Sequence, residues 1–156
     1  DILAKKGAES ILVGPEPGCG ISFSSIKALV KDWEKRTRYK NWSRASGLRI
    51  SKMFISPYAK GWTALLDQNK EDIRLILGML TGHGPLRKHF MKVGLSQSSE
   101  CRLCGEEEES VEHIWLDCPA IVETRKRYLG TYLLSPKDIR EQEPLNLIGF
   151  CKSLGL

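Results

Sequence analysis

The chain has 156 residues, of which 41% are hydrophobic and 28% are charged, and its formal net charge is +5. This length is that of about one domain of the usual ~100 to 200 residues, which excludes a polymerase, a motor or a long repeat array. The composition, with four Trp, is that of a folded protein rather than a disordered one. Apolar runs of about six residues fall short of the ~20 that a membrane span requires, so we expect no membrane-spanning segment.

Charge is distributed unevenly along the chain. Residues 24–60 carry ten Lys or Arg against two Asp or Glu, whereas residues 100–118 carry one against seven. A local excess of cations attracts phosphate backbones, because each neutralised phosphate releases its condensed counterions. The first segment therefore indicates a nucleic-acid-binding surface, whereas the second would repel a nucleic acid.

The N-terminal residues predict the end of a helix and then a linker. Residues 1–9 fit a helix without a beginning, and the chain starts at Asp1 without a leader sequence, so we expect a fragment of a longer protein. Residues 14–20 contain two Pro and three Gly, a composition that stops both helices and strands. We therefore assign residues 1–10 to one domain and residues 11–23 to a linker.

A long basic helix is predicted over residues 24–45, within a basic helical segment that we extend to residue 60. Its apolar residues recur at the spacing of one helix face, which we expect to pack in a core: Ile26, Leu29, Val30 and Trp33. Cations and one aromatic residue on and beside the adjoining face form the candidate nucleic-acid-binding surface: Lys27, Lys31, Lys35, Arg36, Arg38, Lys40 and Trp42. The alternatives are an ordinary solvated helix face and, with Trp33 committed to the core, the less favoured adsorption to a membrane.

Residues 61–156 predict a helical C-terminal region. Residues 48–56 before it fit either a short strand or a helical turn. Asn69 has the position of a cap for a helix that Gly82 ends, with an apolar stripe of Ile73, Ile76, Leu77 and Leu80. Shorter helices are expected from Pro85 to Gly94 and within 119–129, 136–140 and 145–156. Since almost no segment alternates with period two, the predicted fold class is mainly α.

The strongest chemical motif is a Cys-x2-Cys-x8-His-x4-Cys pattern. Two thiolates separated by two residues can wrap one ion in a tight knuckle, and a His and a third thiolate complete a tetrahedron. Four protein ligands leave no open position, which indicates a structural site, and thiolates favour Zn²⁺ over Ca²⁺ or Mg²⁺. The predicted ligands of this structural zinc are Cys101, Cys104, His113 and Cys118.

Other interpretations of this region stay open. The four side chains could simply be buried core residues without a metal. The acidic run at residues 106–109 fits a solvated loop, and with three thiolates it disfavours direct phosphate binding by the knuckle. His83 and His89 fit ordinary loop and helix-surface positions, and Cys19 and Cys151 fit unreactive thiols. The odd number of Cys and their clustering favour a reducing compartment over a disulfide framework.

Several short segments carry a family resemblance. They are residues 80–86 (LTGHGPL), 101–106 (CRLCGE), 112–114 (EHI) and 118–119 (CP), together with weaker matches at residues 1–8, 14–17, 94–95 and 154–156. In this order they resemble the C-terminal end of the polyproteins of non-LTR (Jockey-like) retrotransposons, where an RNase H-like domain precedes a CCHC region.

The resemblance implies that residues 1–10 are the last helix of an RNase H-like domain and that Asp1 is its last metal-binding carboxylate. In such sites several acidic side chains hold two Mg²⁺ ions, and these ions promote cleavage of the RNA strand of an RNA/DNA hybrid. Because the other acids are missing, we expect no hydrolytic activity from this chain alone. The implied parent is an RNA-directed DNA polymerase with RNase H, in which Mg²⁺ belongs to the parent site.

We therefore expect a small helical domain, stabilised by zinc, that binds nucleic acid and supports target-primed reverse transcription. Its expected partners are RNA, DNA or an RNA/DNA hybrid and the rest of the parent polyprotein, in the nucleus and cytoplasm and without a membrane. The alternative is a zinc-stabilised protein-interaction module that docks another domain of the polyprotein. The pattern does not choose between DNA and RNA.

Overall fold

The described part of the protein is built from helices. The structure, a computed structural model, describes residues 1–11, 20–58 and 62–156, and within these ranges it contains no strand, only one isolated bridge between Glu100 and Glu108. The predicted fold class, mainly α, is confirmed. Two compact units divide the chain, Asp1–Thr37 and Arg38–Leu156. Most of the predicted linker, including Cys19, lies outside the described residues.

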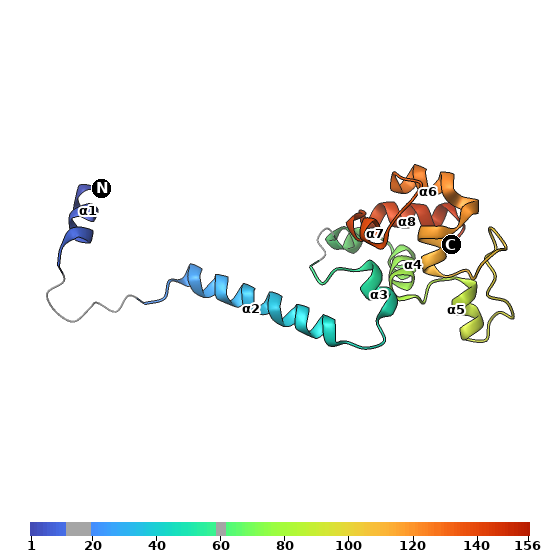
Figure 1. Ribbon diagram of the computed structural model, residues 1–156, viewed down its shortest axis with the longest axis horizontal. Helices are drawn as coiled ribbons and strands as arrows, with labels where there is room; N and C mark the ends of the chain where they lie inside the picture. The colour runs from blue at the N-terminus through green and yellow to red at the C-terminus, as the bar shows by residue number, and fades with distance from the viewer. Residues whose placement is uncertain (12–19, 59–61) are drawn as a thin grey trace. The chain divides into compact units, whose positions relative to one another are not determined.

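The N-terminal unit has no buried residue in its described part. It contains α1 (Ile2–Glu9) and most of α2 (Phe23–Arg44), the long helix of Figure 1. The apolar stripe predicted for α2 is present, but its members are 45 to 65% exposed: Ile26, Leu29, Val30 and Trp33. The expectation that this stripe packs in a core is therefore wrong for the described chain. Helical spacing puts these side chains on one face but supplies nothing to cover that face.

The C-terminal unit consists of short helices and turns. In chain order these are α3 (Arg49–Phe54), the 3₁₀ turn η1 (Trp62–Asp67), α4 (Lys70–Thr81), α5 (Arg87–Lys92), the π-helical turn η2 (His113–Asp117), the 3₁₀ turn η3 (Pro119–Ile121), α6 (Val122–Leu129), α7 (Pro136–Glu141) and α8 (Pro144–Ser153). The ambiguous segment 48–56 therefore forms a helix, α3. Helix α6 packs against α8, and α3 packs against α4 and α7. No helix in the described ranges has the length and apolarity that crossing a bilayer would require.

Helix α4 begins and ends where its sequence predicts, but its buried face differs slightly from the predicted one. The side chain of Asn69 accepts a hydrogen bond from the backbone N–H of Asp72 at 2.9 Å, and Gly82 ends the helix with a left-handed φ of +78°. Ile76 and Leu80 are buried as expected, whereas Leu77 is 48% exposed. The buried face is turned because α4 packs between α3 and α8, and these neighbours decide which side chains are shielded from water.

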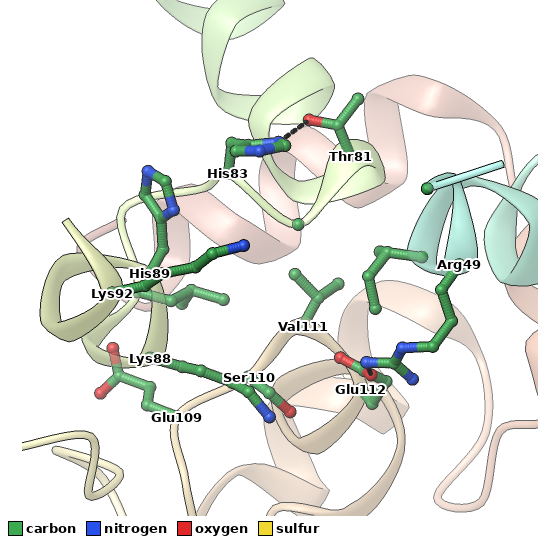
Figure 2. Close-up of a pocket in the computed structure, with 14 residues that line it drawn as sticks. Arg49, Thr81, His83, Lys88, His89, Lys92, Glu109, Ser110, Val111 and Glu112 are labelled. Carbon is green, nitrogen blue, oxygen red and sulfur yellow. Dashed lines mark hydrogen bonds and ion pairs between the residues drawn. The ribbon is translucent and has the colours of Figure 1, made fainter.

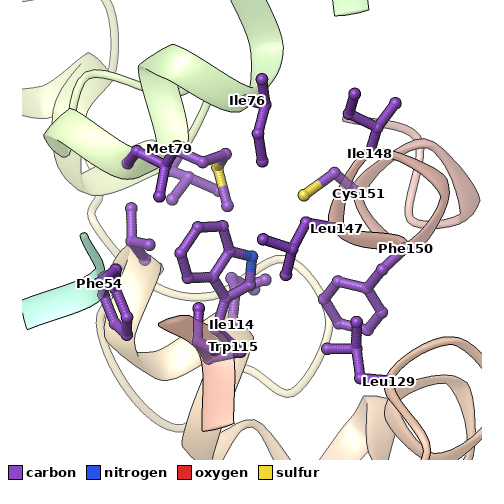
Figure 3. Close-up of a cluster of buried hydrophobic side chains, with 14 of the residues drawn as sticks. Phe54, Ile76, Met79, Ile114, Trp115, Leu129, Leu147, Ile148, Phe150 and Cys151 are labelled. Atoms are coloured by element: carbon purple, nitrogen blue, oxygen red, sulfur yellow. The ribbon is translucent and has the colours of Figure 1, made fainter. Parts of the chain in front are cut away.

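Trp115 lies in the middle of the hydrophobic core, where it is fully buried. Its ring meets Phe54 of α3 edge to face, with ring centroids 4.8 Å apart. Figure 3 shows side chains of α4, such as Met79, and of α8, such as Leu147, on the other sides of the indole. Burial raises the pKa of the neighbouring Cys151 thiol to about 12, which fits the unreactive thiol predicted for it.

Polar contacts hold the peripheral helices onto this core. Lys152 of α8 pairs with Asp72 of α4 at 3.0 Å. The guanidinium of Arg140 in α7 donates to the carbonyl oxygen of Met53 in α3 at 2.8 Å. Because Trp115 follows His113 by two residues and precedes Cys118 by three, the core that buries this indole also positions two of the predicted metal ligands.

Candidate metal centre

The first two predicted ligands sit on a tight turn. The backbone N–H of Gly105 donates to the carbonyl oxygen of Cys101 at 2.9 Å, and Gly105 has a φ of +72°, which a side chain would strain. The backbone N–H of Cys101 in turn donates to the carbonyl oxygen of Glu107 at 2.7 Å. This turn brings the thiols of Cys101 and Cys104 to the same side of the loop.

The other two predicted ligands are the first residue of the π-helical turn η2, His113, and the residue that follows this turn, Cys118. The hydroxyl of Ser110 accepts a hydrogen bond from the backbone N–H of His113 at 3.1 Å, so a serine cap starts the turn that carries the imidazole. At the end of η2 the backbone N–H of Cys118 donates to the carbonyl oxygen of His113 at 2.7 Å. Pro119 then starts the next turn. The wide π turn therefore brings Cys118 next to His113.

All four predicted ligands converge. Their ligand atoms lie within 4.8 Å of one another, with 3.9 Å between the sulfurs of Cys101 and Cys118 and 3.2 Å from the Cys104 sulfur to Nε2 of His113. A tetrahedral zinc with Zn–S bonds of about 2.3 Å separates its ligand atoms by roughly 3.8 Å, so the group fits such an ion. Three of the residues are buried and Cys104 is half-buried. This Cys₃His group could hold a metal ion, and it supplies the four ligands that a tetrahedral site takes.

The thiols differ in how easily they ionise. The backbone N–H of Glu106 points at the Cys104 sulfur at 3.5 Å and, as the main cause, lowers the pKa of that thiol to about 7. Burial raises the pKa of Cys118 to about 12. Since a metal binds the thiolate and not the thiol, an incoming ion meets Cys104 already partly ionised and must displace the proton of Cys118.

Two groups outside the four ligands support them. A carboxylate oxygen of Glu107 lies 3.1 Å from Nδ1 of His113, which orients the imidazole so that Nε2 faces the sulfur of Cys104. The buried guanidinium of Arg125 donates to the carbonyl oxygen of Cys118 at 3.0 Å and to that of Tyr132 at 3.2 Å. Burial lowers the pKa of Arg125, which nevertheless stays a cation beside Cys118.

The acidic run beside the site divides into two parts. Residues 106–108 are exposed, as expected for a solvated loop, but Glu109 is only 1% exposed, which corrects that interpretation. Its oxygens accept hydrogen bonds from the backbone N–H of Arg102 at 2.8 Å, from the Arg102 guanidinium at 2.7 Å and from the backbone N–H of Arg87 at 3.1 Å. Burial alone would raise the pKa of Glu109, but the hydrogen bonds from Arg102 outweigh it and leave the pKa lowered.

Sequence reasoning missed these supporting residues. One carboxylate in a run of four has no pattern that distinguishes it from its neighbours, and an isolated Arg in a helical segment normally lies in solvent. The only local signal was for Arg125, which falls on the same face of α6 as the buried Leu129, four residues later.

The candidate nucleic-acid-binding residues lie along α2, in the two units that share this helix. Six of them are exposed, namely Lys27, Lys31, Lys35, Arg36, Arg38 and Lys40, and Trp42 is half-buried. Arg36 pairs with Asp32 one turn earlier. Asp1, the candidate RNase H carboxylate, is exposed before α1, and the described Cys, His and acidic residues form no metal-binding group around it.

One curated protein is similar to part of this chain. It is the retrovirus-related Pol polyprotein from the type-1 retrotransposable element R1 of Popillia japonica, 32% identical over 71 residues. The match covers 43% of this chain and 26% of that polyprotein, so the chain corresponds to about a quarter of its relative. No family model and no solved structure matches. The similarity supports an origin of the chain in a retrotransposon polyprotein.

Proposed function

We propose that the chain is a zinc-stabilised, nucleic-acid-binding module from the C-terminal end of a retrotransposon reverse transcriptase with RNase H. The observation that carries the proposal is the exposed basic face of α2. Its residues Lys27, Lys31, Lys35 and Arg38 fall within an arc of about 80° at 100° per residue. A row of cations along a helix can follow a phosphate backbone, and Trp42 in the same arc offers a ring for base stacking.

The metal has a structural role in this proposal. Cys101, Cys104, His113 and Cys118 would hold one Zn²⁺ and leave it no open position for a water or substrate. The bound ion would fix the turn at residue 105 to η2, and through η2 to the core around Trp115. Its contribution is therefore folding free energy and not chemistry.

The test of nucleic-acid binding is the salt dependence of affinity. Charge reversal of Lys27, Lys31, Lys35 and Arg38 to Glu should weaken binding of the full chain to a single-stranded oligonucleotide. It should also reduce the magnitude of the slope of log affinity against log salt by roughly 3, at about 0.7 for each phosphate that the helix no longer neutralises. The matched control reverses four exposed cations of the C-terminal unit: Lys70, Arg74, Arg127 and Lys137. A slope unchanged by the α2 variant, or lowered equally by the control, would contradict the proposal.

A protein-interaction module is the second candidate. It is favoured by the exposed acidic side chains of residues 106–108 next to the metal ligands, and by the uncovered apolar stripe of α2. In this alternative the acidic surface docks a basic domain of the same polyprotein. The absence of any oligonucleotide binding at physiological salt would favour it over nucleic-acid recognition.

Residues 1–10 complete the proposal as the end of an RNase H-like domain. Asp1 would then be one of several carboxylates that hold Mg²⁺ in the intact parent. A single carboxylate cannot hold two ions, so an RNA/DNA hybrid should stay uncleaved by this chain in Mg²⁺.

A further inference from the structure

A pocket in the C-terminal unit collects several cationic side chains outside the metal centre. It has a volume of about 270 Å³ and lies between α3, the turn from α4 to α5, α5 itself and the segment that leads to η2. None of the four metal ligands lines it. In Figure 2, His83, His89 and Lys92 gather on one side of this pocket, and Arg49 lies on the other side beyond Val111. We refer to it as the histidine–lysine pocket.

The carboxylates of this pocket are already matched by cations. Glu112 pairs with Arg49 at 2.5 Å, and the oxygens of Glu109 are held by Arg102. Lys88 is also matched, because it pairs with Glu108 at 2.6 Å. Lys92, by contrast, forms no ion pair with any described residue. The pocket therefore carries one cation without a matching anion.

One edge of the His83 ring is engaged by its neighbour Thr81. The hydroxyl of Thr81 donates its only proton to a backbone carbonyl, that of Leu77 at 2.8 Å. It can therefore only accept from Nδ1 of His83, which lies 3.2 Å away. This contact leaves Nε2 as the free edge of the His83 ring.

His89 lies against His83 in this pocket. Its ring meets that of His83 edge to face, with centroids 5.2 Å apart. The pKa of His89 is lowered, first by burial and then by the proximity of His83 and Lys92. Two imidazoles and an ammonium therefore face one space, and an anion between them would offset the effect that lowers the pKa of His89.

We propose that the histidine–lysine pocket binds a phosphate group of a nucleic-acid backbone, with Lys92 as the fixed cation, His89 as an N–H donor and the His83 ring beside them. A metal cation is disfavoured by Lys92 and by carboxylates that are already engaged. A phosphate presents several oxygens to donors from different directions, which matches side chains that come from two elements. This inference rests on the proposed function for the polymer that carries the phosphate.

The test follows the imidazole NMR signals of the full zinc-loaded chain during titration with inorganic phosphate, at constant ionic strength. The signals of His83 and His89 should shift and saturate. Lys92→Gln should weaken phosphate binding at least fivefold, and Lys137→Gln, which removes an exposed lysine of α7, should leave it unchanged. A linear response without saturation, or equal affinity for Lys92→Gln and wild type, would overturn the proposal.

A second titration, with a twelve-residue oligothymidylate, identifies the source of the phosphate. The oligonucleotide should shift the same two imidazole signals and compete with inorganic phosphate. If it binds through α2 while these signals stay in place, the assignment to a nucleic-acid backbone is overturned. If phosphate saturates the pocket but the chain binds no oligonucleotide, the proposed function fails and that assignment fails with it, whereas the phosphate chemistry of the pocket stands. The phosphate titration of the α2 charge-reversal variant should match that of wild type, which keeps the two tests separate.

Discussion

Helices α2 and α4 show how the same sequence pattern can lead to opposite environments. Both have apolar side chains at the spacing of one helix face, yet α2 buries none of its 22 residues and α4 buries four of its 12. Helix α4 is covered by α3 and α8, which are themselves fastened by polar contacts such as the pair of Lys152 with Asp72. Amphipathic spacing thus defines a face, whereas burial depends on which other elements the fold brings to it.

The largest expected effect comes from removal of a metal ligand, which should destabilise the C-terminal unit that contains α4. In Cys118→Ser the buried site keeps only three of its four ligands, and structural zinc in small domains contributes on the order of 10 kcal/mol of apparent binding free energy. We expect native mass spectrometry to find no bound zinc, and the thermal transition of the C-terminal unit to disappear, as it should also do for wild type treated with a chelator.

Cys151→Ser provides the matched control for that substitution. Cys151 is equally buried but lies outside the ligand group, so this variant should melt earlier and still bind one zinc per chain. One bound zinc in Cys118→Ser, with a melting temperature like that of wild type, would show that the four side chains do not act as ligands.

The next largest effect on the free energy of unfolding is expected for a buried tryptophan, compared with an exposed one. Trp115→Ala removes a fully buried ring from the core and should lower the free energy of unfolding by about 3–5 kcal/mol. Trp33→Ala, on the exposed stripe of α2, should change it by no more than about 0.5 kcal/mol. Urea denaturation followed by circular dichroism measures both. Similar decreases for the two variants would mean that the α2 stripe is covered in solution.

A smaller and pH-dependent effect is expected for Glu109. Glu109→Gln should lower the free energy of unfolding at pH 7 by about 1–3 kcal/mol, because it weakens a buried, charge-assisted hydrogen-bond group. The pKa of Glu109 lies below its ordinary value of 4.5, so its carboxylate stabilises the fold above that pH. The stabilisation is lost as the pH falls through the lowered pKa.

The difference between wild type and Glu109→Gln should therefore be constant from pH 7 to pH 5 and shrink below about pH 4.5. Urea denaturation at a series of pH values, in buffers that contain zinc, measures this difference. Glu106→Gln, an exposed neighbour in the same run, should match wild type at every pH. A difference that grows on acidification would contradict the lowered pKa.

Local signals accounted for the ends of the helices and for the ligand set. Asn69 caps α4 as its position predicts, because a side-chain oxygen needs only the backbone N–H groups of the next turn. The Cys-x2-Cys turn is equally local, and the spacing of His113 and Cys118 was enough to nominate them. Their convergence with the first two thiols depends on η2, a π turn that the sequence pattern did not indicate.

Long-range contacts explain the environments of residues that the sequence pattern did not reveal. Glu109 is buried because Arg102 and the start of α5 pack against it. The backbone N–H of Arg87 that donates to its carboxylate is 22 residues away in the chain. His83 and His89 fit isolated surface histidines in the sequence, and only the fold puts their rings 5.2 Å apart in one pocket. Neither arrangement has a periodicity that could reveal it.

The sequence by itself therefore determined a mainly helical chain, the four metal-ligand candidates and the basic character of α2, since each follows from residue types and their spacing along the chain. The tertiary structure alone decided that Trp115 is core and Trp33 is not, that one glutamate of four is buried, and that His83, His89 and Lys92 line one pocket. These outcomes depend on which distant surfaces exclude water from a side chain, and local periodicity carries no information about them.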